Sequence, residues 1–241
     1  MPNRAVPIVI VGQGSYVGRA WKVLSQAGFD PVVHSTTSRA EESPQSTSAT
    51  WGDPNLSFPG EKLVLFETPV ICVNNPFILE EEFLRKHASV YNIHNSDVAK
   101  NRGLAQICTI DTMLDGGTFS GVSLQKISAG LEVDASPTLH IETFPIPDGF
   151  GFEDIMSSLQ NVWLRVLSNY LVPHLKAESV LPEREIAFGP VVTHASVSDK
   201  VLKQGAFSGP LMASGLGNFS RFFPRTEGLI AGFREHWRQF S

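Results

Sequence analysis

The chain has little of what marks several large classes of protein. Its 241 residues include only two cysteines, Cys72 and Cys108, too few for a secreted fold built on disulfides. Lys and Arg number 19 against 24 Asp and Glu, which gives a formal net charge of −5, and no basic run alternates with aromatic residues. This balance offers no general attraction to a phosphate polymer, so we expect no nucleic-acid partner.

Long apolar runs are missing as well. A helix that crosses a bilayer needs about 18 or more consecutive apolar residues, and a secretory signal needs a long apolar region before its cleavage site. The sequence contains neither. We therefore expect a cytoplasmic protein with no membrane partner.

The cysteines and histidines give no sign of a metal site. Both cysteines stand among apolar residues, where a buried and reduced thiol is the expected state. The histidines are scattered, with no pair at the spacing of zinc ligands. We assign no metal.

The residues that are present have the proportions of a globular protein, with 42% apolar and 18% charged. A chain of this length forms one domain, or one domain with a small appendage. Beyond Pro182 the sequence becomes rich in Gly, Pro and Ser. We therefore predict a main domain over 1–182 and a small C-terminal extension over 183–241.

The N-terminal residues predict a βαβ unit. Residues 7–11 form a β-branched run that ends at Gly12, residues 16–27 carry apolar side chains at helical spacing, and residues 31–34 form a second β-branched run. Such a unit makes a pair of parallel strands. Residues 35–60 are mostly Ser, Thr, Pro, Glu and Asp and predict no regular element.

The rest of the chain alternates the same two kinds of element. Strands are expected within 62–74, 89–93, 121–127 and 138–146, and helices over 77–87, 105–113, 152–171 and 226–240. This order predicts an α/β, Rossmann-like fold with a mostly parallel sheet flanked by helices. Ligands of such folds collect at the carboxyl edge of the sheet.

A glycine-rich turn follows the first strand, with Gly12, Gly14 and Gly18 in it. Glycines between a strand and a helix let backbone amides approach a pyrophosphate, so an NADP-dependent oxidoreductase is one hypothesis. However, the spacing is not G-x-G-x-x-G, and no acidic residue ends the second strand. A tight connection is the more frequent reason for such a turn.

A cluster of polar residues lies at the end of the strand near residue 93. Asn92, Ile93 and His94 alternate on an extended backbone, so Asn92 and His94 point to one side and Ile93 to the other. An Asn amide can donate to a carbonyl oxygen that gains negative charge, and a His can assist that oxygen or move a proton. A lone Asn-x-His pair is more often a surface feature, so its weight comes from its context.

That context resembles the folate-dependent formyltransferase family, whose members formylate methionyl-tRNA, glycinamide ribotide, sugar amines and hydroxyornithine. In the family a strand ends in N-I-H-P-S, a K/R-x-R-G loop follows, and a G-V-T/S strand leads to an L-D-x-G segment. This chain has N-I-H-N-S from Asn92, K-N-R-G from Lys100, and G-V-S from Gly121. Asn95 stands where the family usually has Pro.

The resemblance implies a catalytic trio of Asn, His and Asp, of which Asn92 and His94 are the first two. The third member is ambiguous. Reading forward from Gly121 without gaps places Glu132 at its position, whereas reading backward from the later P-I pair places Asp134 there. Asp134 keeps the residue type and is favoured, while Glu132 stays open.

The resemblance further implies N10-formyltetrahydrofolate as the formyl donor and a small-molecule amine as the acceptor. The acceptor favoured first is an amino-sugar nucleotide, with hydroxyornithine or a peptide amine next. A tRNA is disfavoured because the tail is short and not basic. Residues implied to border the folate are Asn75, Phe77, Ile78, Leu79, Leu131 and Asp134, and residues implied to border the acceptor are Gly12, Gly14, Ser15, Arg102 and Gly103.

Other functions stay open beside this one. A formyltransferase-like module without catalysis, which only binds a ligand, would explain the change from Pro to Asn95. A hydrolase that releases formate to water would use the same trio. The extension over 183–241 is expected to bind the acceptor or to form a homodimer, since the apolar face of its last helix fits a contact between subunits as well as packing on its own domain.

Overall fold

The structure is a computed structural model of the chain. It describes residues 6–35, 50–51, 68–75, 78–79, 81–87, 89–132, 134–193, 195–197 and 199–200. The helix expected over 226–240, with its possible dimer face, lies outside the described residues. Most of 35–60 lies outside them too.

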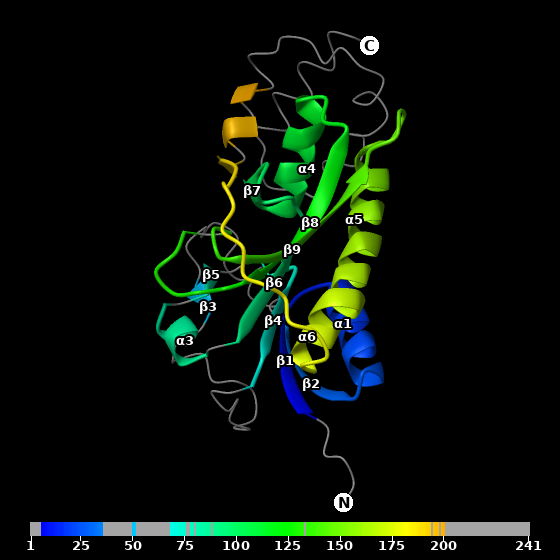
Figure 1. The fold of residues 1–241 in the computed structure, drawn as a ribbon. Helices are drawn as coiled ribbons and strands as arrows, with labels where there is room; N and C mark the ends of the chain where they lie inside the picture. Colours follow the sequence, from blue (N-terminus) through cyan, green and yellow to red (C-terminus); the bar gives the residue numbers. More distant parts are fainter. Residues whose placement is uncertain are drawn as a thin grey trace, which may run out of the picture.

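Six strands form one sheet, in the order β2-β1-β4-β6-β8-β9 (Figure 1). The strands β2, β1, β4 and β6 are parallel, whereas β8 and β9 run antiparallel to their neighbours. The Rossmann-like α/β fold and its largely parallel sheet are thereby confirmed. The bounds are β1 Val6–Gly12, β2 Phe29–Ser35, β4 Val70–Val73, β6 Val90–His94, β8 Phe119–Lys126 and β9 Thr138–Pro145.

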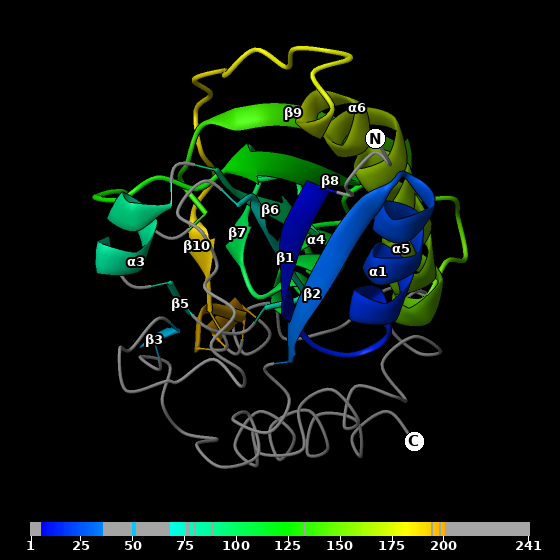
Figure 2. The same cartoon turned by 90° about the horizontal axis from the view of Figure 1, so that it is seen from below.

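Both faces of the central strands are apolar, because helices or loops cover each of them. On β1, Ile8 and Ile10 pack in the larger core cluster with residues of α1 (Ser15–Gln26) and α5 (Phe152–Val166). Their neighbours Val9 and Val11 pack in a smaller cluster on the opposite face. Figure 2 shows α1 and α5 lying together on one side of the sheet.

Helix α5 has the sequence signals of a well-formed helix at its start. Asp154 accepts a hydrogen bond from the N–H of Gly151 over 2.8 Å, and the acidic first turn suits the positive end of the helix dipole. The helix was expected to continue to residue 171, but a π-helical turn, η1 (Leu167–Leu171), follows it, and then α6 (Val172–Leu175). Pro173 lacks an N–H and crowds the preceding turn, which explains the irregularity.

The helix predicted over 77–87 is shorter than expected. Ile78–Leu79 forms a short strand, β5, which pairs with β3 (Thr50–Trp51). Helix α3 therefore begins at Glu81 and ends at Lys86. The acidic run that begins α3 fits a helix start, but pairing with a distant segment decided where it begins.

A second small pairing lies beside the loop after β6. Strand β7 (Arg102–Gly103) pairs with β10 (Val191–Val192), and helix α4 (Ala105–Leu114) follows β7 directly. We call residues 188–193 the C-terminal strap, because this segment runs along β7. The prediction of a boundary after residue 182 remains a prediction, although the described part of 183–200 lies against the main domain.

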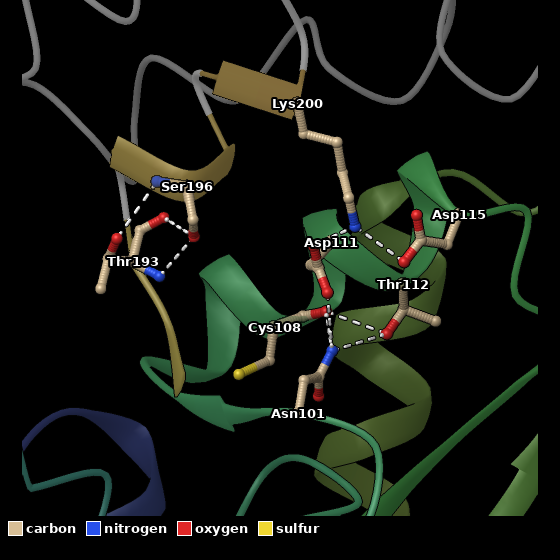
Figure 3. A network of polar contacts seen from close by, with 8 residues as sticks. All are labelled: Asn101, Cys108, Asp111, Thr112, Asp115, Thr193, Ser196 and Lys200. Carbon is tan, nitrogen blue, oxygen red and sulfur yellow. Dashed lines mark hydrogen bonds and ion pairs between the residues drawn. The ribbon is translucent and has the colours of Figure 1, made fainter. Parts of the chain in front are cut away.

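The end of the described chain is fixed to α4 by one ion cluster, which Figure 3 shows. Lys200 Nζ lies 2.6 Å from Asp111 Oδ1 and 2.7 Å from Asp115 Oδ2. Within α4 and the loop before it, the Asn101 amide donates to the carbonyl of Cys108 and to Thr112 Oγ1. The loop after β6, helix α4 and residue 200 are thus held as one unit.

Candidate active site

The candidate site begins at the carboxyl end of β6. Residues of β6 alternate as expected: Ile93 lies in the large core cluster, whereas Asn92 and His94 lie on the other face. The backbone around Ile93 is fixed from the core side, because Trp163 Nε1 donates to its carbonyl over 3.1 Å. His94 is buried, with a relative exposure of 9%.

Asp134 comes to this pair from the loop after β8. Asn92 Nδ2 donates to Asp134 Oδ1 over 3.5 Å, and His94 Nδ1 lies 3.7 Å from the same oxygen. The side chains of His94 and Asp134 are each about nine-tenths buried. Three polar groups from two separate segments therefore share one small, mostly buried space.

The other imidazole nitrogen of His94, Nε2, faces no partner in the part of the chain that the structure describes. His94 Nε2 is buried and makes no hydrogen bond to the described residues. A buried polar atom without a partner is costly, so it marks a place where a ligand or a water completes the site. With Nδ1 beside a carboxylate and Nε2 left for a reacting group, the ring has the arrangement of a general acid or base.

The structure separates the two candidate acids. Glu132 Oε2 accepts hydrogen bonds from Arg102 Nη1 and Nη2, each over 3.3 Å. The Glu132 side chain is 77% exposed. It therefore points away from the pair that Asp134 contacts. Only Asp134, of these two, lies within reach of both Asn92 and His94.

Arg102 and Gly103, expected to border the acceptor, have structural partners as well. Arg102 is buried, its Nε donates to the carbonyl of Gly189 over 2.8 Å, and its guanidinium lies near the ring of Phe188. The N–H of Gly103 donates to Asp134 Oδ2 over 3.2 Å. The R-G pair thus joins the C-terminal strap to the loop that carries Asp134.

The loop after His94 is held in place without the proline that the family usually has. Asn95 is buried beside Tyr16; burial raises the pKa of Tyr16, and the polar side chain of Asn95 opposes the rise. Ser123 Oγ donates to the carbonyl of Ser96 and accepts from the N–H of Val98. Ser123 was not among the predicted site residues, although a polar residue on a buried strand was a signal for such a role.

The glycine-rich turn has a structural explanation that needs no nucleotide. A Cβ on Gly12 would lie 1.8 Å from the carbonyl oxygen of Val73, so the close approach of β1 to β4 requires glycine there. Gly14 precedes α1, and Ser15 Oγ accepts from Gln160 Nε2 over 3.3 Å. Gly18 has open space around it.

The residues implied to border the folate are spread over several segments. Asn75 follows β4 and is partly buried, Leu79 packs partly against the smaller core cluster, and Leu131 is half exposed near Asp134 in sequence. Phe77 and the side chain of Ile78 lie outside what the structure describes. The role of these residues in binding stays a prediction.

Metal ligation and membrane insertion find no support in the described residues. Among them, no group of three or more His, Cys, Asp and Glu side chains is arranged to hold a metal ion. None of the described helices has the length and apolar character needed to cross a membrane.

Burial raises the pKa of each cysteine thiol, Cys72 and Cys108, to about 12.

No family model and no curated protein sequence matches the chain. Solved structures do. A N-formyltransferase from Helicobacter canadensis, in complex with folinic acid and dTDP-3-aminofucose, superposes with a TM-score of 0.58 at 14% identity, over 79% of this chain and 72% of that one. The chain has the formyltransferase fold.

Two other solved structures share this fold with different activities. The phosphoribosylglycinamide formyltransferase of Coxiella burnetii gives a TM-score of 0.57 at 17% identity, over 79% of this chain and 100% of that one. A formyltetrahydrofolate deformylase from Pseudomonas syringae gives 0.55 at 17% identity, over 77% of this chain and 65% of that one. At identities this low, the structural similarity establishes the fold alone, and the reaction depends on the site residues.

Proposed function

We propose that the protein is an N-formyltransferase, which moves a formyl group from N10-formyltetrahydrofolate to the amine of a small molecule. The observation that carries this proposal is the buried His94 Nε2, which has no partner among the described residues while Nδ1 contacts Asp134. It is supported by the fold and by the H. canadensis structure, whose ligands are a formylated folate and an amino-sugar nucleotide. An amino-sugar nucleotide is therefore the first acceptor to test.

The chemistry required fits the three side chains. The folate supplies a formyl group on nitrogen, whose carbonyl oxygen becomes negative when the amine attacks. The Asn92 amide donates to that oxygen, and His94 Nε2 assists it or carries the proton from the attacking amine toward the leaving nitrogen. Asp134 holds the ring by its contact with Nδ1 and stabilises it when it becomes cationic. The transfer written in this way uses no metal ion and no covalent bond to the protein.

The test is a coupled assay of the purified protein. It is incubated with N10-formyltetrahydrofolate and, separately, with an amino-sugar nucleotide, hydroxyornithine or a short peptide amine. Tetrahydrofolate formation and the formylated amine are measured by absorbance and mass spectrometry. Loss of an oxyanion donor typically lowers kcat by about 100- to 1,000-fold. We therefore expect kcat of Asn92→Ala and of His94→Ala to fall by at least that much.

The same assay separates the competing functions. Formate that forms equally well without any amine would identify a hydrolase, the activity named for the P. syringae structure. Folate binding with no turnover would identify a binding module. Binding of NADPH and not of folate would favour an oxidoreductase that uses the glycine-rich turn. A wild-type rate that both alanine variants retain would refute the assignment of Asn92 and His94.

A further inference from the structure

Gln125, on strand β8, lies on the same face of the sheet as the candidate trio. In the antiparallel pairing of β6 with β8, Gln125 is directly opposite Asn92, and Ser123 is opposite His94. Directly opposite residues of such a pair project from the same face. A glutamine thus stands beside the site although no motif drew attention to it.

The amide of Gln125 is entirely buried and is fully used as a donor. Gln125 has no exposed surface, and its Nε2 donates to the carbonyl oxygens of Asp134 and Ser136, each over 3.0 Å. Only the NH₂ group can face two carbonyl oxygens, so this orientation of the amide is determined by its partners. The opposite atom, Oε1, is buried and unpaired among the described residues.

The turn that Gln125 holds includes a residue in an unusual conformation. Asp134 has φ of +54°, in the left-handed region that non-glycine residues rarely occupy. Such a residue persists only when its surroundings fix it. Its side chain is fixed by the N–H of Gly103, and its backbone by Gln125 on one side and by the bond from Ala135 N–H to the carbonyl of Glu132 on the other.

We propose that Gln125 is a positioning residue, which holds the backbone of Asp134 so that its carboxylate meets Asn92 and His94. The proposal rests on the proposed function, since it assigns Gln125 a share in formyl transfer without contact to either substrate. Its two hydrogen bonds close the loop after β8 onto the strand at the position of the trio. The carboxylate then needs no reorganisation during the reaction.

The experiment compares Gln125→Met with wild type. Methionine has a similar length and volume but no donor, so both carbonyls lose their partner while the packing is largely kept. Displacing a catalytic group by about 1 Å costs roughly 100-fold in rate. We expect kcat to fall by about that factor and KM for both substrates to change little, because the trio acts mainly in the transition state.

Two further variants separate positioning from stability. Leu124→Val removes a methylene from the neighbouring buried residue on the opposite face; it should lower the free energy of unfolding but leave kcat near wild type. Gln125→His keeps one N–H donor on a side chain of similar reach and should recover part of the lost rate, and it is the variant measured if Gln125→Met does not fold. An unchanged kcat in Gln125→Met, or an equal loss in Leu124→Val, would overturn the proposal.

A crystal structure of Gln125→Met gives an answer independent of turnover. We expect Asp134 Oδ1 to move out of contact with His94 Nδ1. An Asp134 that stays in place would overturn the positioning role even if formyl transfer is established. If wild type transfers no formyl group, the proposed function fails, and a displaced Asp134 would still support the role of Gln125 in shaping this loop.

Discussion

The backbone N–H of Gly103 donates to the carboxylate of Asp134 over 3.2 Å, and so the loop after β8 is fastened to strand β7. Gly103 has φ of +122°, which side chains other than glycine rarely adopt. A Cβ at this position would also lie 2.6 Å from the carbonyl oxygen of Val192 on β10. Glycine at position 103 therefore allows the pairing of β7 with β10, adopts the positive φ and donates its N–H to Asp134.

Gly103→Ala should be less stable than wild type, because alanine disfavours the positive φ and its Cβ would clash with the carbonyl oxygen of Val192. We expect the free energy of unfolding to fall by about 1–3 kcal/mol, and formyl transfer to fall with it because the Asp134 contact is disturbed. Urea unfolding followed by circular dichroism measures the first effect. Gly18→Ala is the matched control: it lies within α1 with open space around it and should stabilise by about 0.5–1 kcal/mol. A Gly103→Ala protein as stable as wild type would contradict the expected strain.

Asp134→Asn and Glu132→Gln should behave very differently. Asparagine at 134 keeps the shape but removes the negative charge that faces His94 Nδ1, so kcat should fall by about 100-fold or more. Glutamine at 132 can still accept from Arg102, and the Glu132 side chain is largely exposed, so the rate should stay near that of wild type. Steady-state kinetics of the two variants decides which acid belongs to the trio. A larger loss at 132 than at 134 would reverse the assignment.

Lys200→Met should weaken the attachment of residues 199–200 to α4. Burial alone would lower the pKa of Lys200, but hydrogen bonds and attraction from Asp111 and Asp115 raise it on balance. The stabilisation is therefore complete below the ordinary lysine pKa of about 10.4 and is lost as the pH rises through the raised value. Between wild type and Lys200→Met, the difference in unfolding free energy should be on the order of 1 kcal/mol at neutral pH and shrink in alkali.

The control for this variant is Lys176→Met. Lys176 Nζ lies 3.8 Å from Glu178 Oε1, in a looser and more exposed pair, so its loss should be hardly measurable. Thermal unfolding of the three proteins across the alkaline range gives the comparison. A Lys200→Met deficit that grows with pH would contradict a raised lysine pKa in the folded protein.

Both cysteines should resist alkylation in the folded protein. Cys72 and Cys108 are buried, and burial raises the pKa of each to about 12, so almost no thiolate is present at neutral pH. Intact-mass spectrometry after iodoacetamide treatment should show no adduct under native conditions and two adducts in denaturant. Rapid labelling of either native thiol would mean that its segment opens easily.

Local patterns predicted the parts of the fold that local forces determine. The alternation of Asn92, Ile93 and His94 follows from the period of an extended strand, and the structure has it as expected. The predicted start of α3 was wrong because Ile78–Leu79 forms a strand that pairs with another strand almost thirty residues earlier in the chain. Periodicity within one segment carries no information on such a partner.

The choice between Asp134 and Glu132 shows the same limit at the site. Both acids lie in one irregular loop, where no regular side-chain periodicity predicts the direction in which each side chain points. The direction of Asp134 depends on a positive φ, on the N–H of Gly103 and on the amide of Gln125, all set by distant segments. The end of α5 was also predicted too late, at residue 171, because the π-helical turn η1 replaces the α-helix after Val166 and Pro173 follows that turn.

The pairing of β7 with β10 also affects when the site can form during synthesis. Asp134 is anchored to Gly103, and Gly103 is anchored to Val192, almost ninety residues further along. A chain emerging from the ribosome can build the strands around Asn92 and His94 long before it holds that last partner. The strand that carries the anchor of the candidate acid is thus paired only when residue 192 is available, and a fragment that stops at residue 182 would contain all three side chains but not the partner strand of Gly103.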